Sequence, residues 1–257
     1  MSTLAVTKLH GTFNDFVLVD ARTGSLPDPS QFARRVCDRR GGVGADGLLI
    51  VHPSQIADAR MQIINADGSE AEMCGNGMRC VIRYLSENGE GDRFRIETIG
   101  GVIGADVIEK GETFQIRLNV GTPVFQERDL PFRDAVFVVM GNPHVAIFAR
   151  EADEIDVVQA GKRMPDVNVH VVVPRGARRL DVRHYERGVG ETYACGTGAV
   201  SCAVAAIRRS IAESPVDVHV PGGVLRVEWD GSGDAYLTGP AVRVFDAQVE
   251  DARAVSA

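Results

Sequence analysis

Hydrophobic residues recur with helical spacing behind two similar segments of the chain. Residues 74–77 read Cys-Gly-Asn-Gly, and residues 195–198 read Cys-Gly-Thr-Gly. Apolar residues occupy positions i, i+3, i+4 and i+7 after each segment: Met78, Val81, Ile82 and Leu85 after the first, and Val200, Ala203, Val204 and Ile207 after the second. This spacing places an apolar stripe along one side of a helix. The sequence therefore predicts a helix that opens at Cys74 and ends at Asn88-Gly89, and a second that opens at Cys195.

Shorter apolar runs predict strands on both sides of each helix. In the first half they lie near 17–19, 48–51 and 61–64, and then near 93–98, 102–108 and 113–119. In the second half they lie near 136–140, 167–173 and 180–185, and then near 216–220, 224–229 and 235–244. A further helix is predicted over residues 29–39, with Pro29 at its start. The Asp67-Gly68 pair predicts a hairpin turn.

The same order of elements occurs in both halves of the chain. Cys195 follows Cys74 by 121 residues, close to half of the 257-residue sequence. Self-similarity of this kind indicates a duplicated unit. We therefore expect an α/β protein with two lobes, residues 1–120 with Cys74 and residues 121–244 with Cys195, which face each other across a cleft.

Composition and charge narrow the range of functions. The chain has 44% hydrophobic and 25% charged residues, as an ordinary globular protein has. Its net charge of −7 and the lack of a basic block argue against a nucleic-acid partner. The sequence has no signal-peptide pattern and no apolar run long enough to span a membrane. Five cysteines, an odd number, argue against a disulfide framework, so we expect a cytoplasmic protein that acts on a small molecule.

A cysteine at the amino terminus of a helix is suited to proton transfer. The unpaired backbone N–H groups and the helix dipole lower the pKa of its thiol toward neutrality. The glycines that follow allow a ligand to approach the backbone, and the same N–H groups bind anions such as carboxylates. One such cysteine in each lobe predicts inversion of a carbon–hydrogen centre, in which one sulfur removes a proton and the other delivers one to the opposite face. We find no dinucleotide, P-loop or metalloprotease motif, so neither cofactor nor metal is expected.

The sequence resembles the diaminopimelate epimerase family along most of its length. The resemblance lies in residues 10–16, 42–47, 65–80, 140–144, 167–169, 185–198 and 237–240. The most specific blocks are NADGSEAEMCGNG over 65–77 and ERGVGET over 186–192, which leads to Cys195. Membership would imply two pseudo-symmetric lobes, each a curled mixed sheet around a central helix, with a last strand near 245–257 that returns to the first lobe. It would also imply a homodimer.

The resemblance implies a reaction and a set of site residues. The family interconverts LL- and meso-diaminopimelate, a precursor of lysine and peptidoglycan, without pyridoxal phosphate or metal. Cys74 and Cys195 would be the two acid–bases, and His144 would help to set their protonation together with Glu186. The polar ends of the substrate would be held by Asn14, Asn65, Asn142, Asn168, Glu186 and Arg187. Donors to its carboxylates would come from Gly75, Asn76, Gly196 and Thr197.

Other functions remain open from the sequence. Phe13 stands where the family usually has glycine, and the chain is shorter than usual, so a racemase of the same fold for histidine, proline or another amino acid is the alternative. A non-catalytic amino-acid binding protein would use the same cleft. A thiol oxidoreductase or a zinc site would need a Cys-x-x-Cys pair, which the sequence lacks. Cys37, Cys80 and Cys202 are expected in the core.

Overall fold

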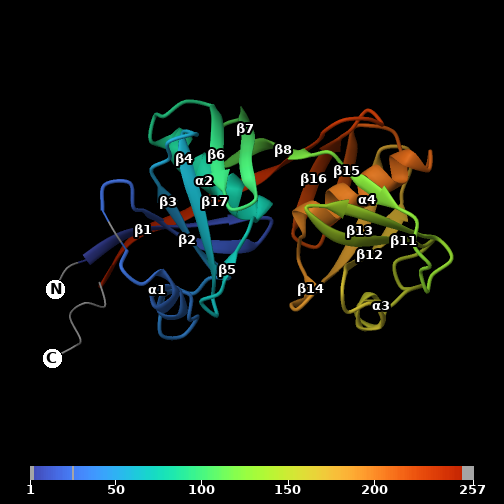
Figure 1. Ribbon diagram of the computed structural model, residues 1–257, viewed down its shortest axis with the longest axis horizontal. Helices are drawn as coiled ribbons and strands as arrows, with labels where there is room; N and C mark the ends of the chain where they lie inside the picture. Colours follow the sequence, from blue (N-terminus) through green and yellow to red (C-terminus); the bar gives the residue numbers. More distant parts are fainter. Residues whose placement is uncertain (1–2, 25, 251–257) are drawn as a thin grey trace. The chain divides into compact units, whose positions relative to one another are not determined.

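Contacts divide the protein into two compact units. The computed structural model describes residues 3–24 and 26–250. Unit 1 consists of Met1–Ile116 with Pro240–Ala257, and unit 2 consists of Arg117–Gly239 (Figure 1). Each unit has its own hydrophobic core.

Unit 1 is a mixed sheet with two helices. Its elements are β1 (Thr3–Gly11), β2 (Asn14–Asp20), α1 (Pro29–Val36), β3 (Gly47–His52), β4 (Ala59–Asn65), β5 (Glu70–Ala71), α2 (Gly75–Glu87), β6 (Arg93–Thr98), β7 (Gly101–Glu109) and the start of β8 (Thr113–Gly121). Strand β1 pairs with β2 antiparallel, and β2 pairs with β3 parallel. Strand β4 is antiparallel to β3 and β5 and parallel to β6, which is antiparallel to β7.

Unit 2 repeats this succession of pairings. Its elements are β9 (Val124–Gln126), β10 (Ala135–Met140), β11 (Asn142–Phe148), α3 (Val157–Arg163), β12 (Asn168–Pro174), β13 (Arg179–Glu186), β14 (Gly190–Thr192), α4 (Gly196–Arg208), β15 (Val216–Val220), β16 (Gly223–Glu228) and the start of β17 (Ala235–Glu250). Strands β10 and β11 are antiparallel, β11 and β12 parallel, and β12 and β13 antiparallel. Strand β13 is antiparallel to β14 and parallel to β15, which is antiparallel to β16. The predicted fold class, two pseudo-symmetric lobes of mixed sheet around a central helix, is confirmed.

The end of β17 belongs to unit 1. Its residues pair antiparallel with β1, from Val242 opposite His10 to Glu250 opposite Thr3. A returning strand was expected over residues 245–257; β17 ends at Glu250, and residues 251–257 lie outside the described residues. In unit 2, β9 occupies the matching place beside β10.

The central helix of each unit is buried on nearly all sides. Every residue of α4 from Gly198 to Ala206 is buried, and most of them are alanine or valine. A helix that is apolar all round is stable only inside a core. Helix α2 buries its apolar stripe together with two charged residues, Arg79 and Arg83. Figure 1 shows α2 and α4 each among the strands of its own unit. Each fully buried aliphatic side chain stabilises this packing by roughly 1.5–3 kcal/mol.

Helix α1 is shorter than predicted. It ends at Val36 rather than at residue 39, because the chain turns back and the N–H groups of Val43 and Gly44 donate to the Val36 carbonyl. The turn needs glycine at position 42, where a Cβ atom would lie 2.2 Å from the Arg35 carbonyl oxygen. These bonds satisfy carbonyl groups that a longer helix would otherwise use.

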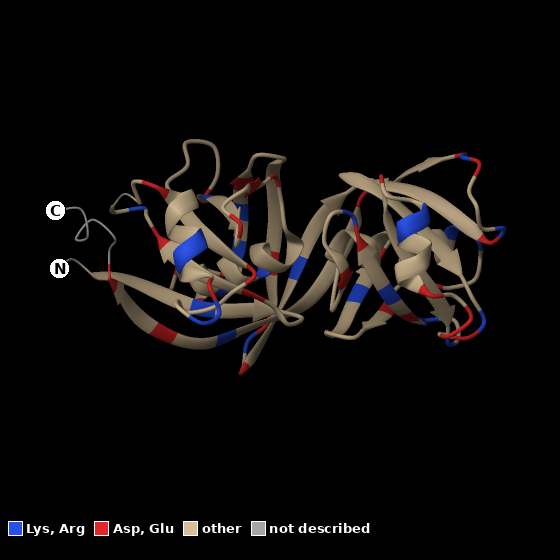
Figure 2. Cartoon of the chain, turned by 90° about the horizontal axis from the view of Figure 1, so that it is seen from below, with Lys and Arg blue, Asp and Glu red and all other residues tan. Residues whose placement is uncertain are grey.

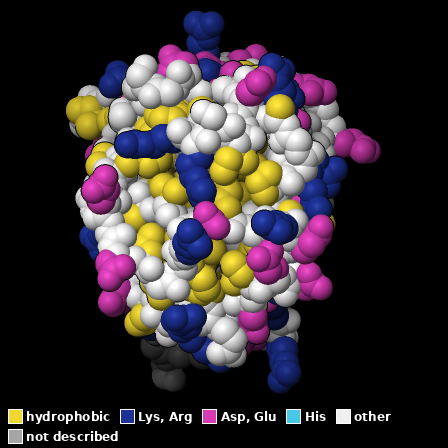
Figure 3. Space-filling view, turned by 90° about the vertical axis from the view of Figure 1, so that its right-hand side faces the viewer, with side chains coloured by type: hydrophobic (Ala, Val, Ile, Leu, Met, Phe, Trp, Pro, Cys, Tyr) yellow, Lys and Arg dark blue, Asp and Glu magenta, His cyan; other side chains and the backbone are white. Residues whose placement is uncertain are grey.

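Charged residues of both signs are mixed along the chain, as Figure 2 shows. The face of the molecule in Figure 3 shows hydrophobic side chains with Lys and Arg side chains lying across them. In unit 2, the guanidinium group of Arg208 lies 4.2 Å from the centre of the Phe125 ring, and that of Arg209 lies 4.7 Å from the Phe148 ring. Such contacts cover apolar surface with cationic side chains. Among the described residues, no helix is long and apolar enough to cross a membrane.

Gly42→Ala tests the turn that ends α1. The added methyl group would meet three backbone carbonyl oxygens, so we expect the free energy of unfolding to fall by about 1–3 kcal/mol. The control is Gly104→Ala in β7, where a Cβ atom meets nothing within 4 Å and the change should stay within about 0.5 kcal/mol. Denaturant unfolding of the two variants measures the difference, and equal midpoints would contradict this account of the turn.

Candidate active site

Cys74 is the N-cap residue of α2. Its backbone is extended, with φ −144° and ψ 115°, so the helix begins at the next residue. Its Sγ accepts a hydrogen bond from the Gly77 N–H at 3.4 Å, which satisfies one of the helix's unpaired donors. The sulfur is half-buried, in contrast to Cys80 in the same helix, which is fully buried in the core. A partly accessible sulfur at a helix amino terminus is the environment of a reactive cysteine.

Asn14 lies against Cys74 and is held in one orientation. Its Nδ2 donates to the Asp46 carboxylate at 2.9 Å, so its Oδ1 must point the other way. That oxygen accepts from Asn76 Nδ2 at 3.2 Å and lies 3.6 Å from the Cys74 Sγ. Asn14, Cys74 and Asn76, which were predicted from the sequence, are thus brought together in unit 1.

Arg79 places a buried positive charge in the first turns of α2. The side chain is fully buried, and its acceptors are neutral oxygens of Pro240, Gly75, Thr12 and Asn76. Burial lowers the pKa of Arg79 to about 10, while interaction with the negative charge of Cys80 and Cys74 raises it. The buried guanidinium group thus places a positive charge close to Cys80 and Cys74.

Cys195 occupies the corresponding place before α4, in a different electrostatic environment. Its side chain interacts electrostatically with the Glu186 carboxylate, and Thr197 Oγ1 lies 3.8 Å from its Sγ. Burial, and then the negative charge of Glu186, raise the pKa of the Cys195 thiol well above its ordinary value, although the Gly198 N–H opposes this. Burial likewise raises the pKa of Glu186, which accepts a hydrogen bond from Thr192 at 2.6 Å. At rest Cys195 is therefore a thiol with a proton acceptor beside it.

The other predicted residues differ in burial and in their hydrogen bonds. Asn168 is buried on β12, where it accepts from the Arg187 N–H at 3.0 Å and donates to the Pro143 carbonyl at 3.1 Å. It therefore fixes the bend at the end of β13 next to Glu186. Asn65 and the Arg187 side chain are exposed, and Asn65 donates to Ser69 at 2.9 Å within its own hairpin. Gly75 and Gly196 are the first residues of the two central helices, so their N–H groups are among the donors that need a partner.

His144 makes two hydrogen bonds inside unit 2. Its Nε2 lies 2.6 Å from Asn142 Oδ1, and its Nδ1 lies 2.9 Å from the Nε2 of His170. His170 in turn contacts His184, whose Nδ1 lies 2.7 Å from the Nδ1 of His170. Burial lowers the pKa of His144 to about 3 and that of His184 to about 3. All three imidazoles are therefore neutral near pH 7.

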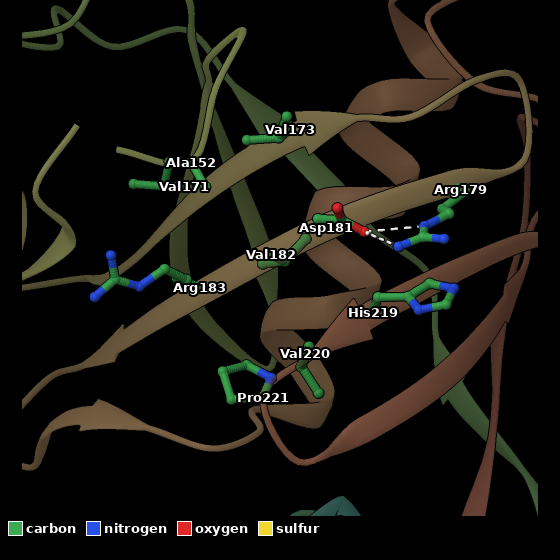
Figure 4. Close-up of a pocket in the computed structure, with 10 residues that line it drawn as sticks. All are labelled: Ala152, Val171, Val173, Arg179, Asp181, Val182, Arg183, His219, Val220 and Pro221. Atoms are coloured by element: carbon green, nitrogen blue, oxygen red, sulfur yellow. Dashed lines mark hydrogen bonds and ion pairs between the residues drawn. The ribbon is translucent and has the colours of Figure 1, made fainter. Parts of the chain in front are cut away.

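A separate pocket of about 260 Å³ lies on unit 2. Figure 4 shows its walls, which come from β12, β13 and β15, with Arg179 paired to Asp181. Val171 and Val173 alternate along β12 with His170, whose ring meets α4, so they point to the opposite face of the sheet. The pocket is therefore not part of the Cys195 environment.

Comparison with known proteins identifies the family. The model of the family described as "Diaminopimelate epimerase" matches residues 6–126 and 136–244. The diaminopimelate epimerase of Desulforudis audaxviator is 40% identical over 93% of this chain and 97% of its own length. That of Archaeoglobus fulgidus is 39% identical over 95% of each chain. This chain belongs to the diaminopimelate epimerase family.

Solved structures at low identity share the fold of this diaminopimelate epimerase family member. A PhzF-family phenazine biosynthesis protein of Bacillus anthracis aligns with TM-score 0.75 and 18% identity, over 97% of this chain and 100% of that one. A predicted epimerase of Pseudomonas aeruginosa gives TM-score 0.75 at 15% identity, over 96% and 99%. A probable proline racemase of Agrobacterium radiobacter gives TM-score 0.71 at 15%, over 96% and 93%. At these identities the likeness extends to the fold alone.

Phe13, where the resemblance to the family leads one to expect glycine, lies in a tight turn. Thr12 and Phe13 form the two-residue link between β1 and β2, with φ values of 54° and 64°. Positive φ at both positions defines a turn in which glycine is favoured, because a side chain is strained there. The Phe13 ring stacks on His10, with 5.4 Å between ring centres and 12° between ring planes. A glycine would adopt the backbone conformation of this turn with less strain than Phe13 does.

Sequence reasoning missed four polar residues of this family member's two sites. Asp46, Arg79, His170 and His184 are not among the site residues that the sequence predicts. Asp46 lies in one of the sequence blocks that resemble the family. Arg79 lies on the apolar side of α2, so the available signal for Arg79 was a charged residue in a position expected to be buried. The two histidines lie on separate strands, and nothing in their spacing relates them to each other.

Asp15, the residue after Asn14, forms ion pairs with Arg39 and Lys8. The variant Asp15→Asn tests this ion network. Burial raises the pKa of Asp15, but hydrogen bonds from Arg39 and Lys8 outweigh this and lower it to about 2. A lowered pKa stabilises the fold above the unfolded value near 3.8 and loses that effect as pH falls toward 2. Allowing for partial solvent screening, we expect the variant to lose about 1 kcal/mol at pH 7, with the gap narrowing below about pH 4.

Thermal unfolding from pH 7 to pH 3 measures this gap. Asp129→Asn, in an exposed loop of unit 2, is the matched control and should change stability by less than about 0.5 kcal/mol. A difference between wild type and Asp15→Asn that stays constant down to pH 3 would be inconsistent with the proposed network.

Proposed function

We propose that the protein interconverts LL- and meso-diaminopimelate by a two-base proton transfer, with Cys74 and Cys195 as the acid–bases. The supporting observation is that both sulfurs stand at the same place in a repeated topology, directly before the buried central helix of each unit. Family membership at 34–40% identity to proteins named diaminopimelate epimerase supports this substrate over histidine or proline.

The reaction needs only a thiolate and a thiol. The thiolate of one cysteine takes the proton from the α-carbon and becomes a thiol, which leaves a carbanion. The thiol of the other cysteine gives its proton to the opposite face and becomes a thiolate. No net proton or electron is gained, and the two sulfurs end in exchanged protonation states, so the next turnover can run in reverse.

The two central helices supply the stabilisation that a carbanion requires. The N–H groups in the first turns of α2 and α4 are donors that favour an anion. A substrate carboxylate bound there gains negative charge as the α-proton leaves, so these donors act most strongly in the transition state. Arg79 assists the thiolate of Cys74, and Glu186 accepts a proton from Cys195 when that sulfur must act as the base.

The polar residues of the two units are assigned to the substrate's ends. In this proposal Asn14 and Asn76 act with Cys74, and Asn142, Asn168, Glu186 and Thr197 act with Cys195. The exposed Asn65 and Arg187 bind the distal amino-acid group of diaminopimelate, which a smaller substrate such as proline lacks. The protein is proposed to be a cytoplasmic homodimer. Analytical sedimentation measures its oligomeric state.

Cysteine variants test the assignment. We expect Cys74→Ala and Cys195→Ala each to lower kcat/KM for diaminopimelate by about 10³-fold or more, since each removes an acid–base. Cys80→Ala and Cys202→Ala are matched controls from the interiors of the same two helices, and they should retain activity within about tenfold. Retained epimerisation in either of the first two variants would disprove the two-base assignment.

A substrate panel tests the specificity. Diaminopimelate, histidine and proline are compared by the rate of stereochemical inversion with the wild-type protein. We expect turnover of diaminopimelate only, and turnover of another amino acid without diaminopimelate would favour the racemase alternative.

A further inference from the structure

Three buried histidines form a hydrogen-bonded chain across unit 2. His144, His170 and His184 lie on the neighbouring strands β11, β12 and β13, and each is 0% exposed. The chain starts at Asn142 Oδ1, 2.6 Å from His144 Nε2. It continues from His144 Nδ1 to His170 Nε2 at 2.9 Å and from His170 Nδ1 to His184 Nδ1 at 2.7 Å. Among the described residues, every ring nitrogen of the three histidines except His184 Nε2 has a hydrogen-bond partner.

These contacts determine the direction of every hydrogen bond. A neutral imidazole has one donor and one acceptor nitrogen. Because Asn142 Oδ1 only accepts, His144 carries its proton on Nε2 and accepts at Nδ1 from His170 Nε2–H. His170 then accepts at Nδ1, so His184 donates through Nδ1–H.

His184, the last residue of the hydrogen-bonded series, agrees with this direction of the hydrogen bonds. His184 Nε2 is left as an acceptor, and it has no hydrogen-bond partner among the described residues. In the reverse direction it would carry a buried N–H without a partner, which is the rarer kind of unpaired group in proteins.

Unit 1 provides an internal comparison for the packing. A Cβ atom on Gly198 would lie 2.5 Å from the His170 ring, and a Cβ atom on Gly77 would lie 2.9 Å from Leu49. His170 and Leu49 therefore occupy matching places beneath the two central helices. Leu49 pairs with Ile63, as His170 pairs with His184.

The parallel pairs complete the match between the units. Leu18 lies opposite Leu49 and Ala146 lies opposite His170, which places Phe16 at the position of His144. Apolar residues fill all three positions in unit 1, so packing against the helix does not itself require histidine. The three histidines of unit 2 therefore have a polar role.

The same match relates the two asparagines and shows what that role is. Asn14 lies two residues before Phe16, and Asn142 lies two residues before His144. Asn14 is held by its nitrogen, which donates to Asp46, so its oxygen is directed toward Cys74. Asn142 is held by its oxygen, which accepts from His144, so its nitrogen is directed away from the histidines. The two units therefore anchor matching carboxamides by opposite atoms, the nitrogen of Asn14 and the oxygen of Asn142.

We propose that His184 and His170 are positioning residues, which fix the Nε2–H tautomer of His144 and thereby hold the Asn142 nitrogen as a donor to a substrate carboxylate. The proposal rests on the proposed function in one respect, namely that Asn142 contacts an amino-acid substrate. With both nitrogens engaged in this way, His144 orients Asn142 and does not itself carry protons to or from a cysteine.

Nitrogen NMR of the substrate-free protein tests the chain without any assay of activity. Long-range ¹H–¹⁵N correlation of ¹⁵N-histidine-labelled protein distinguishes protonated from unprotonated ring nitrogens, and single histidine variants assign the six residues. We expect a protonated Nε2 in His144 and His170 and a protonated Nδ1 in His184 at pH 7. A protonated Nε2 in His184, or a cationic ring in any of the three, would overturn the proposal.

Kinetics of two His184 variants test the consequence for the substrate. His184→Leu removes the donor, whereas His184→Asn keeps a nitrogen at the δ position and can donate to His170. We expect His184→Leu to raise KM for diaminopimelate about tenfold with kcat changed less than about threefold, because a contact present in both ground and transition states is weakened. His184→Asn should restore KM to within about threefold of wild type.

His219→Leu, in the pocket of Figure 4 on the opposite face of the sheet, is the control and should leave KM unchanged. Wild-type KM in His184→Leu, or equal loss in both His184 variants, would refute the positioning role. If the wild-type protein inverts no diaminopimelate, the proposed function fails, while the NMR experiment still decides the tautomers. If His184→Leu does not fold, the wild-type spectrum and His184→Asn still decide the outcome.

Discussion

The amino terminus of a buried helix needs hydrogen-bond acceptors, and this need organises both units. Helices α2 and α4 are enclosed on nearly all sides, so the N–H groups of their first turns cannot all turn to solvent. In unit 1 the Cys74 sulfur accepts one of them, whereas in unit 2 the Cys195 side chain makes no such cap hydrogen bond, although the Gly198 N–H acts to lower the pKa of its thiol. The donors that remain favour a bound carboxylate. Enclosing a helix therefore creates a site for a sulfur and an anion together.

The two units repeat this arrangement, and the residues around each cysteine make the two sites chemically different. The succession of parallel and antiparallel pairings is the same in both units, which sets each cysteine at the same backbone position. Around Cys74 the structure has a buried cation, Arg79, whereas beside Cys195 it has a carboxylate, Glu186. The sulfur in unit 1 thus lies near a cation, whereas the carboxylate in unit 2 favours the thiol form of Cys195. The two cysteines therefore differ chemically, although the backbone frame is nearly symmetric.

The sequence pattern predicted those helices, strands and turns that depend on residues close together in the chain. The stripes of α2 and α4, the Asp67-Gly68 turn and the strands around them follow from spacing and turn chemistry. The early end of α1 depends on hydrogen bonds from the N–H groups of residues 43 and 44 to a carbonyl group of the helix. Strand β11 begins at Asn142-Pro143, a pair that is more typical of a loop. The chain of His144, His170 and His184 depends on strand register, which a single sequence does not reveal. The prediction thus found the cysteines and missed the groups that orient their neighbours.

The central claim is that two separate single-proton groups act on opposite faces of one carbon. Inversion of LL-diaminopimelate in D₂O, stopped at low conversion and analysed for deuterium at the α-carbon, tests it most directly. A thiol that takes a proton from one face cannot deliver that proton to the other, so the account predicts deuterium in the product and none in the recovered substrate. Deuterium in both from the earliest times would mean that one exchangeable base serves both faces, and it would contradict the account.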